Sequence, residues 1–495
     1  MKSLKRIRIC LMSGIVIGMS IRLGCCQTQT VENPSSAPGQ LPPLPQIESL
    51  PSPPSTPAML PPIQPSFKET PLPQVVALPP PLSIPGDVPN RPLTAEEAAQ
   101  IALRHQPGIT IAHGALVSAE GQVVVRRAAL KPTLAINGEY AWGVHPIFGG
   151  QSGAASGGGA GGGDPRTSTS WTASGDIRQL LFDFNHTRDL VRQAEALARQ
   201  AGSGLTKAQS DTVWYVKQSF YTYVEDLALE DVNLSNVRDQ QGHLTLAQAR
   251  LVTGVGVPLD VVMAETAVSD AIFNLASAQN SASLARVNLA LQMGIDPRTP
   301  IQPAPSSETS LQEHDVNALI DEAQRQRPEI VQAQKGVEAA RYGVGAAKTF
   351  NAPSFSLEAS QANTSLPTNS STLGLLLSWD PFDGGLTGGM IKEAQGNLES
   401  SNGQLESARL SVVSDVTQAY LNLKTAEQKS TDADAEAFNA RESLREAEGS
   451  YSAGVGVFLN VLDAQAALVT ALTNQVNARS SLDQSRASLA HAVGK

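Results

Sequence analysis

The sequence of 495 residues contains only three cysteines, and Cys10, Cys25 and Cys26 all lie within its first 26 positions. The rest of the chain therefore has no thiol that could form an internal disulfide or a thiolate metal site. The seven histidines are scattered and never take a ligand spacing such as His-x-x-x-His. We expect a body that is held together by packing alone, with no cofactor and no metal.

Motifs for other chemistry are also lacking. The sequence contains no nucleophile elbow, no P-loop and no dinucleotide fingerprint, so we expect a protein that is not an enzyme. Its 36 lysines and arginines against 46 aspartates and glutamates argue against nucleic acid as a partner. The acidic balance suits a cation-tolerant aqueous lumen, and it equally suits a merely soluble surface.

The N-terminus resembles an export signal. Several basic residues precede a short apolar stretch, Ile9–Ile21, which is typical of a secretory signal and too short for a confident transmembrane helix of about 20 residues. Leu23-Gly24-Cys25-Cys26 follows and resembles the lipobox of bacterial lipoproteins, with the leucine correctly spaced only for Cys26. Residues 1–26 are predicted to be a signal peptide, either of the lipoprotein type with Cys25 or Cys26 lipidated, or an ordinary one with incidental cysteines.

Residues 27–92 are predicted to be a linker, because proline dominates the tract from about Asn33 to Pro92. Such a composition cannot build a core and behaves as an extended, semi-rigid spacer. A tether between a membrane and the folded body is the favoured interpretation, and a recognition role for the prolines is the alternative.

The remaining chain contains one pattern twice. Gly254-Val255-Gly256-Val257 returns 200 positions later as Gly454-Val455-Gly456-Val457, and Phe182-Asp183 returns as Phe382-Asp383. A repeat of this kind fixes the architecture and predicts two similar hairpin units, residues 93–300 and 301–495. Upstream the offset grows to 221, and the extra residues fall near a run of glycine, alanine and serine, Gly149–Gly163. We expect that run to be an external loop.

Helical patterns alternate with short strand patterns in both copies. Helices are predicted at about 93–130, 187–252 and 259–292 in the first copy, and at about 316–348, 386–452 and 459–492 in the second. The longest are roughly 100 Å long at 1.5 Å per residue, which implies a coiled-coil-like assembly. The two shorter helices of each copy together match the long one, so we expect them to be stacked end to end beside it.

Four segments alternate apolar and polar residues, two in each copy, within 134–142, 171–178, 354–360 and 372–379. Such alternation, with aromatic residues near the ends, is typical of outer-membrane strands, although an ordinary half-buried sheet shows it too. The export signal favours the membrane. Four strands cannot close a barrel, and an open edge cannot sit in lipid. Several chains must therefore share one barrel if these strands span a membrane.

These features together resemble the TolC-like outer membrane factor (outer membrane efflux protein) family over about Leu93–Gly494, most specifically in Tyr451-Ser452-Ala453-Gly454 and in Leu459 to Gln465. The resemblance implies a mainly α fold with a membrane β-barrel. Three copies would form a homotrimer with one shared 12-stranded barrel, four strands from each, and long coiled-coil helices would form a periplasmic α-barrel.

The resemblance also implies a location and a function. The protein would be the exit duct of a tripartite efflux or type I secretion system, set in outer membrane lipid with a long periplasmic portion. It would dock on a periplasmic adaptor (membrane fusion) protein and an inner-membrane pump, and passively export small molecules or polypeptides. The alternative is a periplasmic coiled-coil scaffold or tether without a pore, against which the four strands count. The sequence does not reveal the substrate.

Site residues follow from the same resemblance. Asp463 would lie at the pore constriction and match the second aspartate of an acidic ring, with Asn460 where some relatives carry the first. A solvated carboxylate is the alternative for Asp463. Tyr451 and Asp260 match a gate latch, although Tyr451 is as well explained by packing. An arginine of that latch appears here as Gly456, so that part is absent or different.

The two turns are the expected contacts for the adaptor. The residues concerned are Gly254, Val255 and Gly256 in the first copy and Gly454, Val455 and Gly456 in the second. Gly254 and Gly454 suit a turn because glycine tolerates positive φ. The two valines would either contact the adaptor or pack within the tip.

Overall fold

The computed structural model describes residues 79–80, 91–145, 166–304, 315–364 and 369–495. The predicted signal with Cys25 and Cys26, nearly all of the linker and the glycine-rich segment 149–163 lie outside the described residues. The described residues all lie within Thr70–Lys495, one of the two units into which the chain divides, and everything below concerns that unit.

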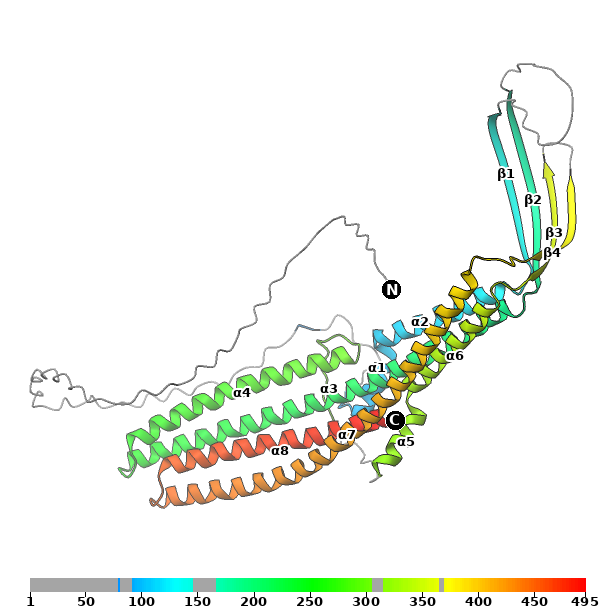
Figure 1. The fold of residues 1–495 in the computed structure, drawn as a ribbon. Helices are drawn as coiled ribbons and strands as arrows, with labels where there is room; N and C mark the ends of the chain where they lie inside the picture. The colour runs from blue at the N-terminus through cyan, green and yellow to red at the C-terminus, as the bar shows by residue number, and fades with distance from the viewer. Residues whose placement is uncertain (1–78, 81–90, 146–165, 305–314, 365–368) are drawn as a thin grey trace, which may run out of the picture. The chain divides into compact units, whose positions relative to one another are not determined.

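The same order of elements occurs twice (Figure 1). The first copy consists of α1 (Ala95–His105), α2 (Pro107–Ala128), β1 (Thr133–His145), β2 (Arg166–Phe182), α3 (His186–Val252) and α4 (Pro258–Gln292). The second consists of α5 (Val316–Gln326), α6 (Pro328–Lys348), β3 (Ser354–Thr364), β4 (Ser370–Ser378), α7 (Leu386–Ser452) and α8 (Phe458–Val493). The predicted repeat, helices and strands are thus confirmed in their order.

Two of the predicted helices are each broken into two. The expected single helices at 93–130 and 316–348 are interrupted at Gln106 and Arg327, where ψ is 118° and 124°. Each of these residues precedes a proline, whose ring disfavours the helical conformation of the residue before it. The prediction of one continuous helix was therefore wrong at the same point of both copies.

Each break lies against the end of the short helix that follows the long one. Gln106 Nε2 donates a hydrogen bond to the carbonyl of Gln292 over 2.9 Å, and Arg327 Nη1 donates to the carbonyl of Ala492 over 3.3 Å. Gly294 completes the first contact, because a Cβ on it would lie 2.7 Å from the carbonyl oxygen of His105. The expected end-to-end stacking of the two shorter helices is confirmed.

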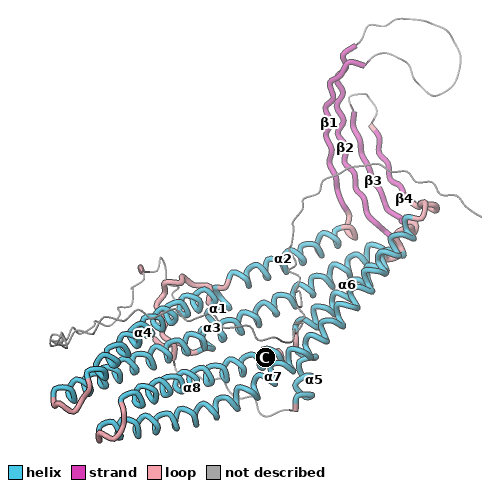
Figure 2. The backbone as a smooth tube through the Cα atoms, turned by 60° about the vertical axis from the view of Figure 1, so that its left-hand side comes forward, coloured by secondary structure: helices cyan, strands magenta, loops and turns pink. Residues whose placement is uncertain are grey.

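The long helices organise the packing. Helices α3 and α7 have 67 residues each, about 100 Å at 1.5 Å per residue. Helix α3 packs on α1, α2 and α4, and α7 packs on α5, α6 and α8. The copies join because α3 also packs on α6 and α8 (Figure 2). Their cores use equivalent buried residues, namely Val216 and Leu289 in one and Val416 and Leu489 in the other.

The four strands form one antiparallel sheet in the order β1-β2-β3-β4, so β1 and β4 are its edges. One register row is apolar and consists of Leu134, Ile177, Ala359 and Leu373. The next row consists of Thr133, Arg178, Glu358 and Gly374, and it carries an ion pair of 3.3 Å between Arg178 and Glu358. Because side chains alternate between the faces of a strand, one face is apolar and the other is polar and charged.

Candidate functional site at the hairpin tips

The two tips have the same backbone. The first is the turn between α3 and α4, where Gly254 has φ +80°, and the second lies between α7 and α8, where Gly454 has φ +81°. In the first tip the amides of Val255 and Gly256 donate to the carbonyl of Arg250 over 3.1 and 2.8 Å. The equivalent bonds of the second tip go to the carbonyl of Ser450. The repeated Gly-Val-Gly-Val motif therefore encodes a hydrogen-bonded turn that ends the long helix, and this turn needs glycine where φ is positive.

The tip valines point away from this turn. Val255 is 67% exposed and Val455 is 83% exposed. Within the single chain, neither valine side chain packs into its tip. Their exposure leaves two apolar side chains at the ends of the hairpins, where they are available to another molecule.

Behind the turns, the two hairpins share one apolar core. Its buried members come from all four helices and are Ala247, Ala264, Leu444, Tyr451, Phe458, Val461, Ala464 and Leu468. Tyr451 is 3% exposed, and its ring lies 5.3 Å from that of Phe458. The packing role expected for Tyr451 is thus real, and it places the tyrosine hydroxyl beside the other hairpin.

The structure brings Tyr451 and Asp260 together. The Tyr451 hydroxyl on α7 donates a hydrogen bond to Oδ2 of Asp260 on α4 over 3.0 Å. Burial, and next the hydrogen bond to Asp260, raises the pKa of Tyr451 above its ordinary value, so the hydroxyl keeps the proton that it donates. A charge-assisted bond of this kind is stronger than one between neutral groups, and it ties the first hairpin to the second.

Arg250 is the residue of this site that the sequence did not predict. Its Nη1 donates to the carbonyls of Tyr451 and Ser452 over 2.6 and 3.3 Å. Its guanidinium also lies over the Tyr451 ring, 4.5 Å from the centroid. A signal was present, because Arg250 stands in the last turn of α3 where the second copy has Ser450. At Gly456, where the family resemblance implies an arginine, a Cβ would lie 3.1 Å from the backbone of Ser450.

Asp463 and Asn460 lie on another face of α8 and take no part in these contacts. Both are exposed, and residues three apart on a helix share one face. The opposite face of α8 is buried through Val461, Ala464 and Gln465. Among the described side chains, no ion pair or hydrogen bond of Asp463 occurs within the protomer, so its carboxylate is directed away from the shared core.

A buried polar layer forms a further link between the hairpins, and the sequence did not predict it either. Gln465 is 1% exposed, and its Nε2 donates to Asn236 Oδ1 over 3.1 Å and to Asp239 Oδ2 over 3.4 Å. His243, also buried on α3, has its Nε2 at 3.8 Å from Glu448 Oε1 on α7. Polar groups that pair inside a helical interface help to fix its register.

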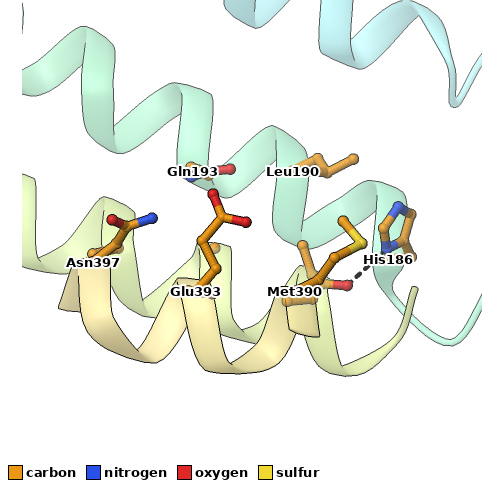
Figure 3. Close-up of a pocket in the computed structure, with 11 residues that line it drawn as sticks. His186, Leu190, Gln193, Met390, Glu393 and Asn397 are labelled. Carbon is orange, nitrogen blue, oxygen red and sulfur yellow. Dashed lines mark hydrogen bonds between the residues drawn. The ribbon is translucent and has the colours of Figure 1, made fainter. Parts of the chain in front are cut away.

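The other end of the long helices contains a cavity of about 230 Å³ between α3, α6 and α7. Its lining includes His186, Gln193, Met390, Glu393 and Asn397 (Figure 3). His186 is held by a contact of 2.9 Å between its Nδ1 and the carbonyl oxygen of Ala346. Within the part of the chain that the structure describes, no cluster of three or more His, Cys, Asp or Glu side chains is placed to hold a metal ion.

Comparison with known proteins gives one consistent result. The family model described as "Outer membrane efflux protein" matches residues 98–294 and 319–495. Protein CyaE of Bordetella pertussis is 24% identical over 340 residues, covering 67% of this chain and 69% of CyaE. Outer membrane protein TolC of Escherichia coli K12 is 25% identical over 334 residues, covering 63% of this chain and 67% of TolC.

Solved structures share the fold. The outer membrane protein VceC of Vibrio cholerae superposes with a TM-score of 0.70 at 18% identity, covering 81% of this chain and 96% of VceC. The outer membrane channel CmeC of Campylobacter jejuni gives a TM-score of 0.71 at 14% identity, covering 81% of this chain and 85% of CmeC. At such identities the likeness concerns the fold.

Proposed function

Because this chain belongs to the outer membrane efflux protein family and serves as an exit duct of the outer membrane, we propose that three copies of it form one channel, which is closed at the hairpin tips. The channel passively exports small molecules or polypeptides. It receives them from a periplasmic adaptor and an inner-membrane pump, in a tripartite efflux or type I secretion system.

The sheet is the observation that supports this proposal most directly. Its edge strands β1 and β4 have no partner on their outer sides among the described residues. In lipid, each unsatisfied backbone group would cost several kcal/mol, so a membrane sheet has to close. Four strands are too few to close on themselves, since the smallest membrane barrels have about eight. Three copies, with β4 of each paired to β1 of the next, give a closed barrel of twelve strands.

The two faces of the sheet suit that barrel. Ile136, Tyr140 and Leu373 lie on the apolar face and are 80%, 72% and 75% exposed in the single chain, so lipid would cover them. The opposite face would line the lumen with Arg178 and Glu358, and with Asp176, which accepts hydrogen bonds from Asn137 and Ser174. Such a wall is wet and slightly acidic.

The helices also have apolar surfaces that the single chain does not cover. Ile111 on α2, Phe273 on α4 and Phe438 on α7 are all more than 60% exposed. By length and composition α2 and α4 resemble membrane spans, but both pack lengthwise on α3. Neighbouring copies in a trimer would cover these surfaces, because burying a large apolar side chain contributes about 1.5–3 kcal/mol.

Three roles are assigned to the tips. The contact between Tyr451 and Asp260 is the latch that holds the hairpins together. Asp463, with Asn460 on the same face of α8, lines the constriction, where three copies of the carboxylate converge. The exposed Val255 and Val455 then meet the adaptor, whose docking would separate the hairpins.

The experiment that tests this function is conductance of the purified protein in planar lipid bilayers, combined with native mass measurement of the detergent-extracted protein. A trimer that conducts ions is expected. A stable monomer, or a trimer without conductance under any condition, would refute the channel and leave the periplasmic scaffold as the better explanation.

A further inference from the structure

The arginine expected at Gly456 is absent, and we infer that Arg250 supplies the cation of the gate from the opposite hairpin, by capping the C-terminus of α7. The inference rests on the proposed function, because it adds one residue to the same latch. The contact itself, however, can be tested without any measurement of conductance.

The guanidinium of Arg250 lies at the C-terminus of α7. Helix α7 ends at Ser452, and the last carbonyls of a helix have no partner within it and form the negative end of its dipole. Arg250 donates to two of these carbonyls, those of Tyr451 and Ser452. The carbonyl of Tyr451 also accepts the amide of Gly454 over 3.0 Å, so the guanidinium is an additional, charged donor there. A cation at this place opposes the helix dipole, and here it comes from a different hairpin.

Arg250 is held at both ends. Its own carbonyl accepts the amides of Val255 and Gly256, which close the first tip, while its guanidinium reaches the second tip. Movement of one hairpin away from the other must therefore break the guanidinium contacts or distort the first turn. A residue placed in this way couples the two tips directly.

The ring of Tyr451 lies between the Arg250 guanidinium and the Asp260 carboxylate. The guanidinium lies over the face of Tyr451, a geometry in which a cation is attracted by the ring. The hydroxyl of the same ring donates to Asp260. Arg250 on α3, Tyr451 on α7 and Asp260 on α4 thus form one continuous chain of contacts, in which the arginine also fixes the ring that presents the hydroxyl.

The two copies of the repeat differ at this contact. The turn motif is identical in both copies, but every member of this chain of contacts differs from its equivalent 200 positions away. The pairs are Arg250 with Ser450, Leu251 with Tyr451, and Asp260 with Asn460. A serine is too short to reach across, and a leucine has no hydroxyl. The contact therefore occurs once per protomer and cannot form in the reverse direction.

The test is hydrogen exchange of the backbone amides in residues 444–456, measured on the full-length trimer. Arg250→Ala is compared with Arg445→Ala, a matched control at the same end of α7. The Arg445 side chain is 70% exposed, and among the described residues it pairs only with Glu442 on its own helix. Arg250→Lys is the second variant, because lysine keeps the charge but not the planar fork.

We expect exchange in this segment to become roughly tenfold faster in Arg250→Ala, since the bonds to a charged group are lost, and to stay near the wild-type rate in Arg445→Ala. Arg250→Lys should fall between them. Unchanged exchange in Arg250→Ala, or an equal increase in the Arg445 control, would overturn the inference.

Bilayer conductance of the same variants separates this inference from the gate. Faster exchange together with a larger open fraction supports both the contact and the proposed latch. Faster exchange with an unchanged open fraction still supports the contact, and it would show that the proposed gate is the part that fails.

Discussion

Tyr451→Phe isolates the latch from the packing around it. The change removes one hydroxyl, and with it the hydrogen bond of 3.0 Å to Asp260. The ring stays, so the contacts with Phe458 and with the Arg250 guanidinium are kept. Any effect on the closed state therefore reports the loss of this one bond.

Its size follows from the type of bond. A hydrogen bond to a charged acceptor contributes about 1.5–3 kcal/mol, and the half-buried position of Asp260 favours the lower end. About 1.5 kcal/mol corresponds to a roughly tenfold shift from closed to open for one protomer. If three protomers open together, the three contributions add, and the shift becomes about a thousandfold.

The open fraction is measured by single-channel recording in planar bilayers. The matched control is Tyr342→Phe on α6, where an arginine, Arg192, also lies near the ring, at 5.9 Å. Within the described residues, the Tyr342 hydroxyl makes no hydrogen bond. The reasoning is refuted if Tyr451→Phe assembles normally and its open fraction equals that of the wild type, or if the control opens equally.

The same hydroxyl sets a pH dependence. The pKa of Tyr451 lies above its ordinary value of 10.0, first because of burial and then because of Asp260. Because the pKa of the Tyr451 hydroxyl is raised in the closed state, its hydrogen bond stabilises that state fully below the ordinary pKa. This stabilisation is lost as the pH rises through the raised pKa. The open fraction should therefore increase only above about pH 10, and Tyr451→Phe should lack this alkaline increase.

Two further predictions concern the constriction and the stacking of the helices. Asp463→Ala should raise conductance modestly and reduce block by divalent or trivalent cations from the periplasmic side. Asn460→Asp should strengthen that block, because it adds a carboxylate to the same face. Unchanged block in both variants would place Asp463 outside the lumen. Gly294→Ala should lower thermal stability by more than Gly254→Ala. Both positions have positive φ, but only at Gly294 would the added Cβ meet backbone, at 2.7 Å, so equal melting temperatures would contradict the close packing.

The strands and the long helices could be predicted because their signals are local. Period-two alternation marks a strand wherever it occurs, and the repeat doubled the number of observations for each element. The breaks at Gln106 and Arg327 also had a local signal in the prolines that follow them. They were missed because the helical pattern continues on both sides of each proline, and nothing local showed that the end of a distant helix lies against the bend.

The site was predictable only in part. Tyr451 and Asp260 came from a family resemblance, and the structure places them in contact. Arg250 was not predicted, because its partners are backbone carbonyls 201 and 202 positions away. A backbone carbonyl leaves no mark in the side chains of the sequence. An arginine in the last turn of a helix is normally expected to serve the carbonyls of its own helix. The pairing of Gln465 with Asn236 was hidden for the same reason, since only the packing of α8 on α3 brings these amides together.

The duplicated architecture gives a physical reason for the asymmetry of the tips. The core residues Val216 and Val416 are equivalent and equally buried, because each copy packs an equivalent set of shorter helices on its long helix. In a ring of three such chains, six tips alternate, and each tip meets one neighbour within its own protomer and one in the next. Identical tips would make these two kinds of junction alike. Arg250, which only the first copy has, contacts Tyr451, which only the second has, within one chain. In the proposed trimer this contact would make the junction within a protomer different from the junction between protomers. A perturbation that breaks the contact between Arg250 and Tyr451 should therefore separate the two hairpins of one chain before it separates one chain from the next.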